Sequence, residues 1–166
     1  MTAQKHLFGR FVKDLPCGEL IWIGVRPARK AALIVLDEVE AVAGLGLQGD
    51  HRCSKTPGSA RQVTLISAEF IQLIEHYSGH TSIDPGLLRR NLVVKGINLN
   101  ALRHQQFRIG EALFEATALC HPCSRMDQAL GRGGLVAMLG YGGLCATIIE
   151  GGRIAVGDTL TPVVSE

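Results

Sequence analysis

The segment Cys120-His121-Pro122-Cys123 carries the clearest chemical potential in this sequence, because two thiols lie close together beside a proline and a histidine. Residues 124–130 after it have the pattern of a short helix. Helix N-termini and neighbouring cations, here Arg125 and His121, favour the thiolate form of a cysteine. A thiolate is a nucleophile and a ligand for soft metals, so this segment is the first candidate for a reactive site.

Three interpretations of the segment compete. A thioredoxin-like dithiol needs its CxxC after an early strand and at the head of a long helix, whereas this one lies late and among strands. A zinc site needs a second ligand pair, and His51 with Cys53 is too closely spaced for a usual half-site. In the third and favoured interpretation, Cys120 is packed at the end of an apolar strand and Cys123, beyond the proline, is the working thiolate.

The other cysteines give weaker signals. Five cysteines, unevenly spaced and without a secretory signal, do not indicate a disulfide framework. Cys17 and Cys145 have apolar neighbours and are predicted to be structural thiols. Cys53 lies in a basic loop, where the sequence does not fix its role.

A second group of residues is basic and distributed along the chain. Arginine forks suit phosphate and other planar oxyanions, although a single arginine more often solvates the surface. Asp50 and His51 follow a glycine-rich stretch, where they either orient a ligand or cap the loop. The basic group comprises Arg52, Lys55, Arg61, Arg89-Arg90-Asn91 and Arg125.

The bulk composition limits the classes of partner. The 166 residues suit one domain, 1–166, and a formal net charge of +2 is too mild to indicate nucleic-acid binding. The N-terminus lacks the apolar core of a signal peptide, and no later stretch is apolar for long enough to cross a membrane. We therefore expect a cytoplasmic protein without nucleic-acid or membrane partners.

Short strands joined by glycine turns dominate the expected structure, with 20 glycines in all. A helix is expected after Ser67, with Phe70 and Tyr77 on its apolar face and Gly79 at its end. Gly151-Gly152 is expected to form a hairpin turn. The fold class is therefore mainly β (α+β), a β-barrel with a few short helices. Strands are predicted at 20–25, 32–42, 62–66, 91–95, 107–109, 112–119, 145–150, 153–156 and 159–164, with helical turns at 84–85 and 136–139.

Six blocks of this sequence together resemble the MOSC family, named for the C-terminal domain of molybdenum-cofactor sulfurases. They are GLQGDH (46–51), RQVTLI (61–66), RRNL (89–92), GINL (96–99), FRIG (107–110) and CHPCSRM (120–126). The likeness covers about residues 20–164. It is specific because the blocks occur in the family's order, whereas one block alone would prove little.

The resemblance implies a strand-rich barrel that binds the molybdenum cofactor, molybdopterin. It implies that Cys123 coordinates the metal or carries sulfur as a persulfide. It also implies that the remaining site residues line the cleft for the pterin and its phosphate. Loop 138–143 would form one wall of the cleft, and it departs from the family because Leu139 and Tyr141 make this wall more apolar than the Arg or His of many relatives. Pyridoxal phosphate binding is a further association at the level of the family. The cleft residues are Asp50, His51, Arg61, Arg89, Arg90, Asn91 and Arg125.

Two functions follow from the resemblance, sulfur transfer and molybdenum-dependent reduction of N-hydroxylated compounds. Either one needs a small-molecule cofactor or substrate and a protein partner, a sulfur donor or a reductase. Two alternatives remain open. One is a cofactor-free module that binds an anionic metabolite or a partner protein, and the other is a thiol-redox protein that uses Cys120 and Cys123 as a pair.

Overall fold

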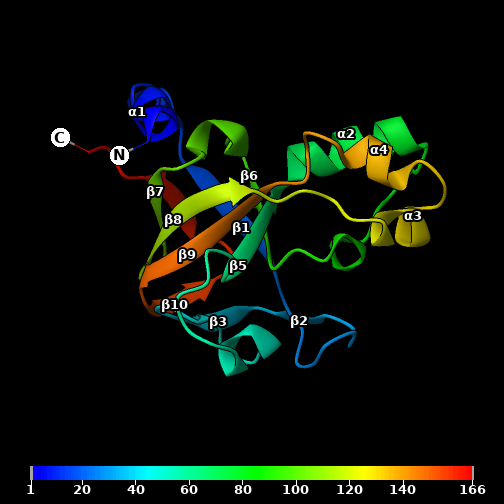
Figure 1. Ribbon diagram of the computed structural model, residues 1–166, viewed down its shortest axis with the longest axis horizontal. Coiled ribbons are helices and arrows are strands. Elements are labelled where there is room, and N and C mark those ends of the chain that lie inside the picture. Colours follow the sequence, from blue (N-terminus) through cyan, green and yellow to red (C-terminus); the bar gives the residue numbers. More distant parts are fainter. Residues whose placement is uncertain (1, 166) are drawn as a thin grey trace.

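Seven strands close into a mixed β-barrel in the computed structural model, which describes residues 2–165 (Figure 1). The strand order is β11-β7-β8-β9-β5-β6-β1, and β11 pairs with β1 to complete the ring. The β-barrel predicted from the sequence is confirmed. The barrel strands are β1 (Gly18–Val25), β5 (Val63–Ser67), β6 (Leu92–Lys95), β7 (Gln106–Ile109), β8 (Ala112–Leu119), β9 (Leu144–Glu150) and β11 (Thr159–Pro162).

The prediction of one strand over residues 32–42 is wrong. The chain bends at Asp37, whose carbonyl accepts the amide of Val156 at 2.8 Å. This bend separates β2 (Ile34–Leu36), which pairs with β1, from β3 (Glu38–Val42), which lies in a second sheet. Apolar residues recur on both sides of Asp37, so the sequence pattern did not reveal the change of sheet.

The predicted hairpin at Gly151-Gly152 is also wrong. β9 pairs with β8 and β5, whereas β10 (Gly152–Ala155) pairs with β3. β4 (Gly46–Leu47) completes this three-stranded sheet, which lies below the barrel in Figure 1. The glycine pair therefore carries the chain from the barrel into the second sheet.

The helices mostly follow the sequence-based expectations. α2 (Ala68–Ser78) is capped by Ser67, whose hydroxyl accepts the Phe70 amide at 3.0 Å, and it ends at Gly79 in the left-handed conformation. Tyr77, expected on the apolar face, is 56% exposed. α3 (Arg125–Leu130) and α4 (Gly134–Met138) pack beside α2 on one side of the barrel (Figure 1). The remaining helical segments are α1 (Ala3–Gly9), which was not predicted, and the 3-10 turns η1 (Val12–Asp14), η2 (His51–Ser54), η3 (Pro85–Leu88) and η4 (Leu99–Leu102).

The barrel interior is filled by large apolar side chains. Phe107 and Phe114 are directly opposite each other on β7 and β8, and their rings stack with centroids 5.3 Å apart. Both are fully buried, and burying a side chain of this size contributes about 1.5–3 kcal/mol. This packing makes the barrel a rigid frame for the loops at its ends.

Strand directions bring three chain ends together at one end of the barrel. β5 and β6 are parallel, so both begin at the same end, and β1 is antiparallel to β6, so it finishes there. Residues 26, 61–64 and 89–91, which flank these strand ends, therefore gather at one location.

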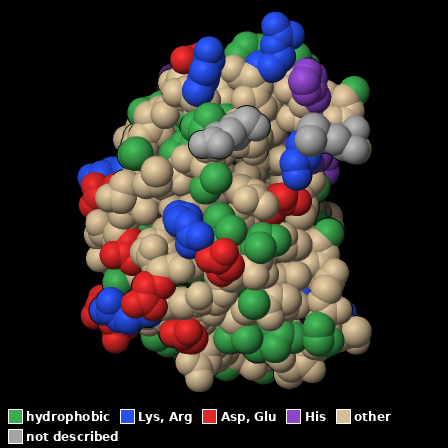
Figure 2. Space-filling model, turned by 90° about the vertical axis from the view of Figure 1, so that its left-hand side faces the viewer, with side chains coloured by type: hydrophobic (Ala, Val, Ile, Leu, Met, Phe, Trp, Pro, Cys, Tyr) green, Lys and Arg blue, Asp and Glu red, His purple; other side chains and the backbone are tan. Residues whose placement is uncertain are grey.

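Positive and negative side chains are mixed on the face of the molecule that Figure 2 shows, where they lie beside one another. Several ion pairs join such side chains, including Arg153 with Glu38 and Arg108 with Glu150. Within residues 2–165, no helix combines the length and apolar character needed to cross a membrane.

Two glycines test the close packing between β9 and β5. Gly143 and Gly140 both have positive φ, but a side chain at Gly143 would overlap the Leu65 carbonyl, whereas Gly140 faces open space. We expect Gly140→Ala to lower the free energy of unfolding by about 1 kcal/mol. We expect Gly143→Ala to cost more than about 3 kcal/mol, because backbone must move. Urea unfolding measures both, and equal losses would contradict the packing described.

Candidate functional site: an arginine-rich cavity

A cavity of about 320 Å³ lies where these chain ends meet. All eight residues that the sequence singled out as site candidates line it: Asp50, His51, Arg61, Arg89, Arg90, Asn91, Cys123 and Arg125. Arg52 and His121, which the sequence analysis also named, line it too, whereas Lys55 of the basic group does not. The structure adds Arg26, Leu33, Gln62, Val63, Thr64 and Met126. Residues from distant parts of the chain thus form one site.

The carboxylate of Asp50 is the structural centre of one wall. Its Oδ2 accepts the Arg26 amide at 2.9 Å and the Asn91 Nδ2 at 3.2 Å. Its Oδ1 accepts the Arg52 amide at 3.0 Å and lies 3.4 Å from His51 Nδ1. Asp50 is only 8% exposed, so its role is that of a loop cap, the second of the two roles considered for it.

Asn91 joins three strand ends. Its Oδ1 accepts the Thr64 amide at 3.1 Å and the Thr64 hydroxyl at 3.2 Å, and its Nδ2 donates to the Gly24 carbonyl at 3.1 Å. With the further bond to Asp50, both side-chain donors and the acceptor of Asn91 are in use. Asn91 therefore orders the site and has little hydrogen-bonding capacity left for a ligand.

Arg90 is a buried cation that holds surrounding loops. It is 4% exposed, and its Nε donates to the Gly142 carbonyl at 2.8 Å. Its Nη1 donates to Leu88 at 2.9 Å and its Nη2 to Cys120 at 3.3 Å, both at the carbonyl oxygen. Burial lowers the pKa of Arg90, and no carboxylate is among its partners in the described chain. It therefore adds positive charge to the cavity while its donors are directed at backbone.

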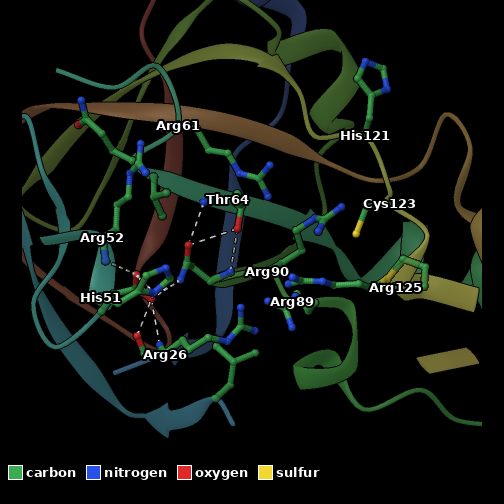
Figure 3. A pocket seen from close by; sticks show the side chains of 16 residues that line it. Arg26, His51, Arg52, Arg61, Thr64, Arg89, Arg90, His121, Cys123 and Arg125 are labelled. Carbon is green, nitrogen blue, oxygen red and sulfur yellow. Dashed lines mark hydrogen bonds and ion pairs between the residues drawn. The ribbon is translucent and has the colours of Figure 1, made fainter. Parts of the chain in front are cut away.

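Four arginines that line the cavity have guanidinium groups without a hydrogen bond or ion pair in the described chain: Arg52, on the side away from Cys123 in Figure 3, and three arginines nearer to Cys123. Within residues 2–165, the side chains of Arg61, Arg89 and Arg125 make no hydrogen bond or ion pair. Figure 3 shows them around the same space as the Cys123 sulfur. Partial burial, and then the charge of Arg125, lowers the pKa of Arg89. Asp50 is the only carboxylate among the lining residues described, so this cavity is suited to an anion with more than one negative charge.

The backbone of Arg89 is strained. It follows η3 with φ 59° and ψ 36°, a left-handed conformation that is usually occupied by glycine. For a residue with a side chain this conformation costs on the order of 1 kcal/mol. Strain at a position that carries a free cation into a cavity is typical of a functional site.

Cys120 and Cys123 have different surroundings. Cys123 is exposed at the cavity, whereas Cys120 is only 2% exposed, which confirms that Cys120 is packed. The neighbouring Cys145 thiol, with Arg90 and Arg61, lowers the pKa of Cys120. Cys120 is therefore a buried thiol close to Cys145 of β9, and the His121 ring points away from Cys123 in Figure 3.

The other two cysteines are only partly as expected. Cys17, predicted to be a structural thiol, is exposed, with its sulfur 3.9 Å from the Thr161 hydroxyl. Cys53 donates to the Leu47 carbonyl at 3.0 Å, and burial raises its pKa. Residues 2–165 contain no group of three or more His, Cys, Asp or Glu side chains arranged to hold a metal ion, so the zinc interpretation has no ligand set.

Loop 138–143 does not form the apolar wall expected from the resemblance. Leu139 is 54% exposed, and neither it nor Tyr141 lines the cavity. Tyr141 instead packs edge-on against Phe70 of α2, with ring centroids 5.6 Å apart. Gly142 is the residue of this loop that contacts the site, through its carbonyl bond to Arg90.

The family model for the MOSC domain matches residues 48–161, which is most of the chain. The chain belongs to the MOSC domain family. A search of curated proteins found no match. Among solved structures, the YuaD protein from Bacillus subtilis is similar, with a TM-score of 0.75 and 17% identity, over 88% of this chain and 95% of that one.

YiiM from two bacteria is also similar to this MOSC domain. The Escherichia coli structure has a TM-score of 0.65 and 20% identity over 89% of this chain and 71% of that one. The Geobacillus stearothermophilus structure has a TM-score of 0.67 and 16% identity over 88% of this chain and 75% of that one. At these identities the likeness shows a shared fold.

Arg26 and Thr64 are two of the lining residues of the MOSC domain that the sequence analysis did not single out. Arg26 was assigned to a basic turn, and Thr64 stands within an apolar strand. Arg26 gave a signal, because it ends a strand just before a proline, where a loop must begin. Thr64 gave none, because its partner Asn91 is 27 residues away in sequence.

The Asp50 network can be tested by mutation. Asp50→Ala leaves three N–H donors without an acceptor, and we expect it to lower the free energy of unfolding by about 3 kcal/mol. Asp84→Ala is the control, because the exposed Asp84 accepts only the Gly86 amide, and its loss should cost about 1 kcal/mol. Urea unfolding compares them, and a smaller loss for Asp50→Ala would contradict a central role for this carboxylate.

Thiol alkylation tests the difference between the cysteines. We expect iodoacetamide to modify the exposed Cys123 and Cys17 at least about tenfold faster than the buried Cys120 and Cys145, because alkylation requires access. Mass spectrometry of digested protein gives the rate at each site, with unfolded protein as the reference. Modification of Cys120 as fast as Cys17 would show that the thiol pair is accessible.

Proposed function

We propose that this MOSC domain binds the molybdenum cofactor in the arginine-rich cavity, with Cys123 as the thiolate that ligates the metal or carries sulfur. The observation that carries the proposal is the position of one exposed thiol beside three free arginines in a single cavity. A soft thiolate suits a sulfur-ligated metal, and arginine forks suit a phosphate.

The residues present fit such a cofactor. Arg61, Arg89 and Arg125 are available for a phosphate or another multiply charged anion, and the Asp50–Asn91 network holds the wall that faces them. One protein thiolate is sufficient for a metal whose other ligands belong to its cofactor. When bound, the cofactor would supply oxidation and reduction at the metal.

Cys123 also has the access that a sulfur carrier needs. Its thiolate would attack the terminal sulfur of a persulfide on a donor protein, which forms a new S–S bond, breaks the donor's S–S bond and releases the donor thiolate. The persulfide on Cys123 would then be held beside the free arginines. Cys120, which is buried against Cys145, is not placed for that attack.

The activity we propose is either this sulfur transfer or, with a reductase partner that supplies electrons, reduction of N-hydroxylated compounds. The five free cysteines are consistent with the reducing cytoplasm, which is the compartment we propose. A cofactor-free anion-binding module is the alternative outcome of the following test.

Metal and pterin analysis tests the proposal. We expect protein from a host that makes the cofactor to contain one molybdenum and one pterin per chain. Cys123→Ser should lose the metal or the transferable sulfur, and Cys17→Ser, which changes another exposed thiol, should lose neither. The proposal would be contradicted if the wild-type protein contained no molybdenum, no pterin and no persulfide on Cys123. The anion-binding module would then be the remaining function.

Arg89→Gly tests the anion site without adding strain. Glycine adopts the left-handed conformation of this position freely, so the free energy of unfolding should not fall. Loss of one charge-assisted contact, about 1.5–3 kcal/mol, should weaken retention of pterin about tenfold or more. Unchanged pterin content after dialysis would exclude Arg89 as a ligand contact.

A further inference from the structure

A second cavity, of about 590 Å³, continues outward from the arginine-rich one. Five residues line both cavities and form the junction between them: Arg26, Leu33, Arg89, Arg125 and Met126. Cys123 lines only the inner cavity. We name the second cavity the outer groove, and it shares the free arginines Arg89 and Arg125 with the inner cavity.

The outer groove has more apolar side chains than the inner cavity, beside the polar Lys30, Asp84 and Gln128 and the arginines of the junction. Its walls include Trp22, Val35, Leu87 and Ala129, together with Leu33 at the junction. Leu87 is 46% exposed and Val35 60% exposed, so both present apolar surface that a ligand in the groove would remove from water. A volume of about 590 Å³ lies within the range of about 300–1,000 Å³ that is typical of small-molecule sites.

Gly24 connects the two compartments. A side chain at Gly24 would lie 2.6 Å from Trp22 Cζ3 and 3.2 Å from Leu33 Cδ2, so the indole ring packs directly over this glycine. The carbonyl of the same residue accepts the Asn91 amide in the inner network. The position of Trp22 is therefore tied to the hydrogen bonds that order the inner cavity.

The loop that walls the outer groove is held by Arg26, which lies at the junction. Arg26 donates from Nε to the Ala31 carbonyl at 2.9 Å, which braces residues 26–31 against the junction. Lys30 in this loop has φ 67° and lies at the rim of the groove. The loop with the strained Lys30 backbone therefore lies on the same groove as the free guanidinium groups of Arg89 and Arg125.

We propose that the outer groove binds the apolar body of the substrate, a small molecule with one ring or a group of similar size. Its anionic or polar head lies at Arg89 and Arg125 and faces the inner cavity. This inference rests on the proposed function, because it takes the inner cavity as the cofactor site and leaves the outer groove for the substrate. Trp22, Leu87 and Leu33 then determine which substrates are accepted.

The sequence contains a single tryptophan, so the fluorescence of Trp22 reports directly on the groove. The probes are benzoate and acetate, which share a carboxylate and differ in the ring. We expect saturable fluorescence changes, with benzoate binding about tenfold or more tightly than acetate because the ring loses contact with water. Equal affinity for the two probes would overturn the proposal.

Two matched variants locate the binding site of the ring. Leu87→Asn makes the groove polar at nearly constant size, and Leu139→Asn makes the same change at a leucine that is 54% exposed and outside the groove. The preference for benzoate should fall at least about fivefold in Leu87→Asn and stay unchanged in Leu139→Asn. An unchanged preference in Leu87→Asn would overturn the proposal.

Molybdenum and pterin are measured in the same preparations. Unchanged content in Leu87→Asn, together with the lost preference, supports a substrate groove separate from the cofactor site. The wild-type protein could instead contain no molybdenum or pterin and still prefer benzoate in a way that depends on Leu87. That result would support the groove and overturn the cofactor assignment. The failure of one proposal is therefore distinguishable from the failure of the other.

Discussion

The hydrogen bonds of Asp50 and Asn91 support the rest of the site. The Asp50 carboxylate accepts two backbone amides from separate loops, and Asn91 binds it while also joining β1 and β5. These groups are largely withdrawn from water, so each unmade bond would leave a donor unsatisfied. The network fixes three chain ends that would otherwise move independently, and the arginines extend from those ends.

The cost of this arrangement is a concentration of like charge. Burial, and then the charges of neighbouring arginines, lowers the pKa of Arg26 and of Arg89, and Arg89 also occupies a strained backbone conformation. Neither feature stabilises the folded chain. Both are understandable if a multiply charged anion is the natural counterpart of the cavity, since its binding would relieve the repulsion. The ion pairs elsewhere on the surface show that the excess charge is local.

The two cavities divide the chemistry of the cleft between charge and apolar contact. Gly24 links the two cavities, because its carbonyl accepts a hydrogen bond in the inner network and its lack of a side chain leaves room for Trp22 of the outer groove. The thiols also differ in their access to solvent, because Cys123 is exposed whereas Cys120 and Cys145 are buried. One cysteine can meet a ligand, and the other two pack between β8 and β9.

The sequence by itself determined the local features of this protein. The capped helix after Ser67, the 3-10 turn after Asp84 and most barrel strands follow from hydrophobic period and capping chemistry, which act over a few residues. The family blocks also contain all eight predicted site residues, and each of them lines the cavity. Only the tertiary structure decided which of them are free for a ligand, because Arg90 and Asn91 are occupied by partners distant in sequence, such as Gly142 and Gly24. It also decided the division of residues 32–42 between two sheets and the pairing of β10 with β3, since strand partners are chosen by long-range packing that no local pattern encodes.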